Sequence, residues 1–278
     1  MRVASPTAVS ISDQRQSGIW YTAARDCTQA TVCSTPVAAA ISSARRTHGS
    51  PSRRSGNQQG ECWAMLAQGG LLIRLGRADE AQRLADAALL LADGETMKSE
   101  AICALCGLAM ARLLTGDRAG AYQAGERAVS QMRRIKPVAY WLQNALSLNA
   151  EALLSLQETE ATSAAPQVRR LADEAVETLC RFARQLPLAR PHAHLWRGLS
   201  AWLAGRQSQA MREWHKAASL GDRLGLRYEV GRANFEIGRH LPPGEQRTSS
   251  LRFAQDEFER LGCTVELERT KDLSRSHS

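Results

Sequence analysis

Aromatic residues, lysines and long apolar runs are all scarce in this sequence of 278 residues. Phe, Trp and Tyr together make up 5% of it, and lysine occurs at positions 98, 136, 216 and 271. The longest apolar candidate, residues 85–92, contains an aspartate and is far shorter than the roughly 20 residues that span a bilayer. We therefore expect no membrane-spanning helix and no membrane partner. β-branched residues are also sparse after residue 60, where Ala, Leu, Arg and Glu dominate, and this composition favours an all-α fold.

Motifs that carry chemistry are missing as well. The sequence has no GxxxxGK[ST] loop for a nucleotide phosphate, no HRD and DFG pair of a kinase, and no GxSxG nucleophile. Paired aspartates in the βαββ context of a cyclase cannot be placed either. We therefore predict no catalytic and no cofactor-binding residue, no cofactor, and a protein that is not an enzyme.

The cysteines are odd in number and irregular in spacing. They stand at positions 27, 33, 62, 103, 106, 180 and 263. Cys103 and Cys106 form a CxxC, but it lies inside a helical pattern and no second pair follows at zinc-site spacing. We interpret the cysteines as small apolar residues with reduced thiols, which predicts no metal site and a cytoplasmic location.

Charge and composition divide the chain near residue 58. The net charge of +8 invites a nucleic-acid hypothesis, but residues 1–60 hold seven arginines and two aspartates, so +5 belongs to them. The rest, with 29 basic and 26 acidic residues, is nearly balanced, and we expect no nucleic-acid partner. Residues 1–58 lack hydrophobic periodicity and are predicted to be a disordered tail. A transit peptide and the remnant of an upstream domain boundary remain alternatives.

A recurring frame organises residues 59–273. Three glycines that fit helix-ending turns, Gly76, Gly116 and Gly205, are each followed at offsets of five, nine and twelve by mostly small residues. Small–turn–small spacing of this kind is typical of tetratricopeptide-type hairpins, although any alanine-rich antiparallel bundle is the alternative. The residues that define the frame are Gly69, Gly76, Ala81, Gly116, Ala121, Gly198, Gly205, Ala210, Trp214 and Ala217.

Apolar residues at three- and four-residue spacing predict ten helices in five hairpins, forming a right-handed solenoid. The charged end of the chain, residues 264–278, is expected to fray, with the alternative that Val265 and Leu267 cap the last hairpin. His192 and His194 are two apart on one helix, so they cannot chelate together, and a surface or capping role is favoured. His215 and His240 have no carboxylate at a catalytic spacing. The tryptophans predicted to pack in the core are Trp63, Trp141, Trp196, Trp202 and Trp214.

Residues 190–262 carry a resemblance to a known group of proteins. The matching residues are Trp196, Gly198, Trp202, Gly205, Trp214, Leu224-Gly225-Leu226, Tyr228-Glu229, Glu236-Ile237-Gly238-Arg239 and Phe258-Glu259-Arg260-Leu261-Gly262. This region resembles the C-terminal tetratricopeptide-like, MalT-type helical part of large bacterial signalling proteins. Those proteins carry an adenylate/guanylate cyclase or serine/threonine kinase domain and an AAA/STAND-type ATPase module. The resemblance weakens over 61–185 and is absent over 1–58.

Two non-catalytic functions follow as expectations. The resemblance implies a regulatory scaffold at the sensor end of a signalling protein, working with a cyclase, kinase or ATPase partner. The alternative is a free-standing adaptor without a link to nucleotide signalling, because a repeat array presents a concave groove to a protein or peptide. The first helices of the hairpins would line that groove with exposed polar and aromatic side chains.

Overall fold

The computed structural model describes residues 58–92, 96–135, 140–159 and 165–275. Every regular element within these ranges is helical, and no strand occurs in them, so the predicted all-α class is confirmed. The segment for which we predict a disordered tail lies outside the described residues, apart from Gln58. None of the described helices combines the length and the apolar character that a membrane span needs.

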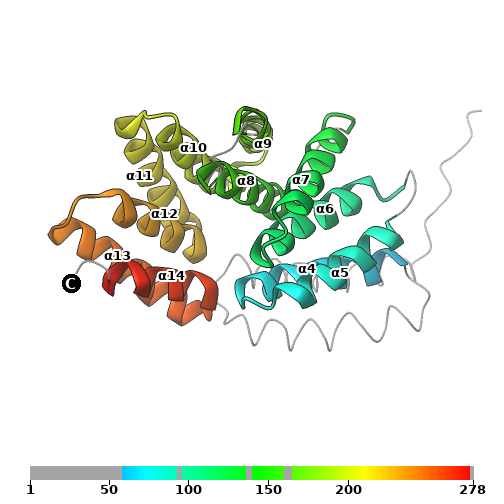
Figure 1. Ribbon diagram of the computed structural model, residues 1–278, viewed down its shortest axis with the longest axis horizontal. Helices are drawn as coiled ribbons and strands as arrows, with labels where there is room; N and C mark the ends of the chain where they lie inside the picture. The colour runs from blue at the N-terminus through cyan, green and yellow to red at the C-terminus, as the bar shows by residue number, and fades with distance from the viewer. Residues whose placement is uncertain (1–57, 93–95, 136–139, 160–164, 276–278) are drawn as a thin grey trace, which may run out of the picture.

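The described helices form five hairpins followed by a single helix (Figure 1). The hairpins are α4 (Gln58–Arg74) with α5 (Ala78–Leu91), α6 (Lys98–Leu114) with α7 (Arg118–Met132), α8 (Leu142–Thr159) with α9 (Ala165–Gln185), α10 (Arg190–Leu203) with α11 (Gln207–Leu224), and α12 (Arg227–His240) with α13 (Glu245–Leu261). A 3-10 turn, η2 (Pro187–Ala189), leads into α10, and α14 (Thr264–Arg275) closes the described chain. Neighbouring hairpins pack against each other, so each helix is covered by its own partner and by the next hairpin.

Local sequence explains where these helices begin and end. The Asp117 side chain accepts a hydrogen bond from Gly120 N at 2.9 Å and caps α7. The helices α11 and α13 end at Gly225 and Gly262, both in the left-handed conformation that glycine adopts without a Cβ clash. The long α9 buries Val168, Leu171, Val176, Leu179 and Phe182 on one face, as its three- and four-residue spacing predicts.

The charged end of the chain corrects the prediction that it frays. Residues Thr264–Arg275 form α14, which packs against α13 and α4 and buries Glu266 and Thr270. Glu266 meets Arg74 of α4, with Oε1 2.8 Å from Nη1. The prediction failed because the partner that offsets the charge of Glu266 lies 192 residues away, beyond any local pattern.

The two ends of the hairpin array share one apolar cluster. Figure 1 shows α14 beside α4 on the side of the molecule opposite α9. The cluster joins Leu71 and Leu72 of α4 to Phe258 and Leu261 of α13, with Phe235 of α12 between them in the sequence. Burial of this apolar surface therefore holds the first and last hairpins together.

The tryptophan prediction is confirmed for Trp196 and Trp214, and in part for Trp141 and Trp202, which pack against the same core cluster. Trp196 and Trp214 have no exposed surface and belong to the larger cluster that runs from α6 to α12. Trp63, Trp141 and Trp202 are only half-buried. Trp63 instead packs its ring against Trp141 and donates its indole hydrogen to Glu100 Oε1 at 2.8 Å.

Candidate functional site

The three turn glycines of the sequence frame all lie between the helices of a hairpin. Gly76, Gly116 and Gly205 have φ angles of 70°, 85° and 76°, in the left-handed region. The N–H of each bonds to a carbonyl three residues earlier, which closes the last turn of the preceding helix. Side chains with a Cβ are disfavoured in this conformation, so these positions require glycine for the turn.

The small residues of the frame lie at contacts between the paired helices. A Cβ added to Gly198 of α10 would stand 2.3 Å from Trp214 Nε1 of α11, so only glycine lets the indole fit there. A Cβ on Gly69 would meet the Ala81 backbone oxygen at 3.8 Å, an ordinary contact. The remaining frame residues are almost completely buried: Ala81, Ala121, Ala210, Trp214 and Ala217.

A buried network of ion pairs fills the side of the array where the first helices of the hairpins meet. Arg74 lies at its centre, with Nη1 3.2 Å from Glu151 Oε2 and 2.8 Å from Glu266 Oε1. Its guanidinium also covers the Tyr228 ring at 4.3 Å, and the Tyr228 hydroxyl donates to Glu266 Oε1 at 2.8 Å. Burial works against the charge of Glu151, but Arg74 and Arg232 hold its pKa below the usual range.

Arg232 extends this network along α12. Its Nη2 lies 3.4 Å from Glu151 Oε1 and 3.2 Å from Glu236 Oε1. Glu236 in turn accepts a hydrogen bond from Arg239 Nε at 2.7 Å. Glu151, Arg232 and Glu236 are at least nine-tenths buried, whereas the side chains of Arg74 and Arg239 are partly exposed. The network thus links α4, α8, α12 and α14 through charges that the protein itself neutralises.

The groove that the first helices were predicted to line stays a prediction, but several of their polar and aromatic side chains contact one another. On α8, α10 and α12, Trp196 Nε1 donates to Ser147 Oγ at 2.7 Å, and Arg232 lies 5.3 Å from the Trp196 ring. These side chains therefore stabilise the array and are not available to a partner.

His192 is buried, so the surface or capping role favoured from sequence is wrong. It is 2% exposed, with Nδ1 3.2 Å from Ser147 Oγ and 3.4 Å from Glu229 Oε1. Burial and, to a smaller extent, the charge of nearby Arg74 together lower the pKa of His192 to about 4. Burial raises the pKa of Glu229 to about 8. These shifts favour a neutral imidazole beside a protonated carboxyl at neutral pH rather than an ion pair. His194, as the helical spacing requires, contacts a different neighbour, Glu213 of α11.

His240 lies in an aromatic stack that the sequence did not indicate. Its ring stacks on Trp202 at 4.1 Å and on Trp214 at 5.0 Å between centroids. Its Nε2 is 3.6 Å from Glu236 Oε2, one helical turn earlier, so a carboxylate does stand near this histidine. Burial lowers the pKa of His240 to about 3, with Arg239 and Arg247 adding to the effect, so the imidazole is neutral. The i, i+4 spacing from Glu236 was the available signal.

Burial disfavours the thiolate form of the described cysteines. Burial raises the pKa of Cys62 and of Cys263 to about 12, and that of Cys180 to about 11. The CxxC residues Cys103 and Cys106 are shifted upward by burial as well, so neither thiolate forms at neutral pH. Within the part of the chain that the structure describes, no group of three or more His, Cys, Asp or Glu side chains is arranged to hold a metal ion.

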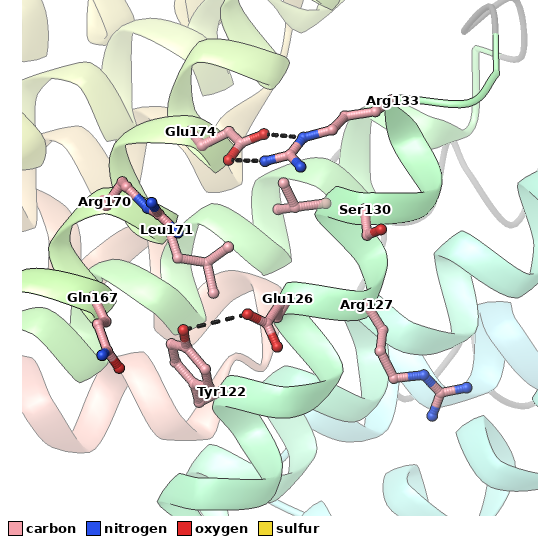
Figure 2. Close-up of a pocket in the computed structure, with 10 residues that line it drawn as sticks. Tyr122, Glu126, Arg127, Ser130, Arg133, Gln167, Arg170, Leu171 and Glu174 are labelled. Carbon is pink, nitrogen blue, oxygen red and sulfur yellow. Dashed lines mark hydrogen bonds and ion pairs between the residues drawn. The ribbon is translucent and has the colours of Figure 1, made fainter. Parts of the chain in front are cut away.

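An accessible hollow of about 320 Å³ lies between α7 and α9, the second helices of two consecutive hairpins (Figure 2). Arg133, which directly follows α7, forms a bidentate ion pair with Glu174 of α9 across the hollow. This pair links the two neighbouring hairpins. Tyr122 and Glu126 lie at the other end, with 3.5 Å between the hydroxyl and Oε1. The lining residues are Tyr122, Glu126, Arg127, Val129, Ser130, Arg133, Gln167, Arg170, Leu171 and Glu174.

This hollow suits binding rather than catalysis. Its apolar floor and charged rim can accept side chains of a partner, and its volume is at the lower end of the roughly 300–1,000 Å³ of ligand sites. No family model matches the chain, and no curated protein matches it.

Proposed function

We propose that the chain is a non-catalytic protein-interaction scaffold of tetratricopeptide type. The observation that carries the proposal is the contrast between the buried ion-pair network and the hollow between α7 and α9. The charged residues of the first helices neutralise one another in a buried network, whereas the hollow between α7 and α9 is accessible. Burial also holds His192 and His240 neutral and the thiols protonated, which supports a structural role for the groups best suited to acid–base or nucleophilic chemistry.

The repeat assignment is supported by the positions of its frame residues. Left-handed glycines stand at the three turns, and small residues stand where paired helices touch. A right-handed solenoid of five hairpins fits this pattern, with α14 covering its end. A generic helical bundle does not require the same spacing to recur at the same contacts.

Two forms of this scaffold function differ in their partner. The resemblance favours a regulatory part of a bacterial signalling system in which a cyclase, kinase or ATPase subunit supplies the chemistry. A free-standing adaptor is favoured by a specific observation: the residues that carry the resemblance serve the fold. Trp196, Trp214 and Phe258 are core residues, and Gly198 makes room for an indole. The match at these residues therefore supports a helical repeat fold and gives no support to a role in signalling.

Affinity capture with the full chain from a lysate of its native cells, read by mass spectrometry, tests the proposal. Recovery of a cyclase, kinase or ATPase supports the regulatory form. Recovery of unrelated proteins that share a short peptide supports the adaptor. A catalytic turnover of small molecules by the purified chain would contradict the scaffold proposal outright.

A further inference from the structure

Positive charge is concentrated on the two helices that form the hollow. Residues 118–134 and 165–185 together contain eight basic and four acidic residues, a net of +4. The rest of residues 61–278 contains 21 basic and 22 acidic residues. The whole excess of positive charge in the helical part therefore belongs to α7, α9 and the residues that follow α7. A local excess of this kind attracts anionic partners.

Not every arginine at the hollow is free to bind. Arg133 is held by Glu174, and on the exposed side of α9 Arg169 lies 4.0 Å from Asp173. Arg127 and Arg170 are exposed and make no ion pair with any of the described residues. Figure 2 shows them on different helices, with the Arg127 side chain extending away from α9. Each helix of the hollow thus carries an arginine without an ion-pair partner among the described residues.

The floor between these arginines is apolar. Val129 is 3% and Leu171 is 7% exposed, and both contribute to the lining, together with the half-buried Tyr122 ring. Apolar side chains of a bound segment would therefore be desolvated here while its carboxylates reach the arginines.

We propose that this hollow binds an acidic, amphipathic peptide segment of a partner protein. The inference rests on the proposed scaffold function and names the chemistry of its partner. Carboxylates of the segment pair with Arg127 and Arg170, and an apolar side chain between them contacts Val129 and Leu171. Glu126 lines the same hollow and disfavours closely spaced negative charges, so a peptide with separated carboxylates fits better than a nucleic acid with a phosphate on every nucleotide.

Selection of displayed peptides tests the proposal without a known partner. A phage library of random 12-residue peptides is panned on the full chain, and the enriched peptides are then measured on a variant carrying R127E and R170E. We expect enriched peptides that combine Asp or Glu with Leu, Ile or Phe. Their affinity, measured by fluorescence anisotropy, falls at least about tenfold on R127E/R170E, because the attractive charge pairs are lost and charge reversal makes both contacts repulsive.

Matched controls distinguish a general effect of arginine charge from an effect of the arginines at the hollow. The variant R212E/R223E makes the same change on two exposed arginines of α11 that have no ion-pair partner among the described residues, and it should alter affinity less than about twofold. Replacing Asp and Glu of an enriched peptide by Asn and Gln should weaken binding to the wild type as strongly as R127E/R170E does.

The outcomes distinguish the two proposals. Peptides that bind R127E/R170E as well as the wild type place the interaction elsewhere, which overturns the groove assignment but leaves the scaffold function standing. Enrichment of neutral or basic peptides overturns the partner chemistry. Tighter binding of a 20-base single-stranded DNA that depends on Arg127 and Arg170 overturns the peptide in favour of a nucleic acid. No enrichment on the wild type counts against both proposals.

Discussion

At the scale of single residues, one tight contact between helices depends on a residue that has no Cβ. Gly198 and Trp214 are adjacent because the glycine has no Cβ, and the indole then donates to the Leu195 carbonyl of the same helix as Gly198, at 3.2 Å. A second residue-scale feature is the neutral pair of His192 and Glu229, whose protonation states are set by burial. Both features make quantitative predictions.

The variant G198A should lower stability by about 1–3 kcal/mol, because its Cβ would overlap the Trp214 ring and force the packed helices apart. Chemical denaturation followed by circular dichroism measures the change. The control is G107A in α6, where an added Cβ meets no atom within 4 Å. That variant should gain up to about 1 kcal/mol from helix propensity. Equal effects of the two substitutions would contradict the tight contact.

Glu229 should make stability fall as pH rises between 6.5 and 8. Its folded pKa of about 8 lies above the ordinary 4.5, so between these values the folded state holds a proton that the unfolded state has lost. His192, lowered from 6.5 to about 4, acts in the opposite direction, but only below pH 6.5. Replacing Glu229 by Gln should therefore remove a fall of roughly 1–2 kcal/mol between pH 6.5 and 8. An unchanged pH profile in E229Q would show that Glu229 is ionised in the fold.

At the scale of elements, the helices and their hairpin pairing could be predicted from sequence, and α14 could not. Periodic apolar residues and turn glycines are local signals, so they locate α9 and the turns at Gly76, Gly116 and Gly205. The stability of α14 depends on Arg74, which no window of the sequence includes together with Glu266. The buried network and the burial of His192 were missed for the same reason.

The contribution of α14 can be measured with two glutamates of that helix. Glu266 is 1% exposed and contacts Arg74, whereas Glu268 is exposed and lies 3.6 Å from Lys271. We expect E266Q to cost about 2–4 kcal/mol, because it leaves a buried arginine partly uncompensated. E268Q should stay within about 0.5 kcal/mol of the wild type. Thermal unfolding of both variants tests this, and a similar melting temperature for the two would mean that α14 is not anchored by Glu266.

At the scale of the whole molecule, the array is joined end to end. Open repeat arrays fray from their terminal repeats, because each repeat contacts only its neighbours. Here the apolar cluster that contains Phe258 of α13 also contains Leu72 of α4, so the first and last hairpins depend on each other. We therefore expect one cooperative unfolding transition for the described helices.

The variant F258A tests this coupling. Phe258 is completely buried, so truncation should cost about 3–5 kcal/mol. Hydrogen exchange monitored by mass spectrometry should then accelerate in Gln58–Arg74 as well as in Glu245–Leu261. A change confined to the last two hairpins would show that the array behaves as an open chain of repeats. The control is F253A, which truncates an exposed side chain of the same helix. It should leave hydrogen exchange in α4 unchanged.

The contact between Arg74 and Glu266 also has a consequence in time. The two residues are 192 positions apart, so at synthesis rates of about 5–20 residues per second one leaves the ribosome about 10–40 s after the other. During that interval α4 is complete, but α14 does not yet cover the end of α4 that carries Arg74. Arg74 therefore lacks Glu266, one of its two carboxylate partners. A nascent chain that stalls before α14 thus presents an apolar, positively charged end, and this is the stage of synthesis at which chaperones and proteases would find the protein most vulnerable.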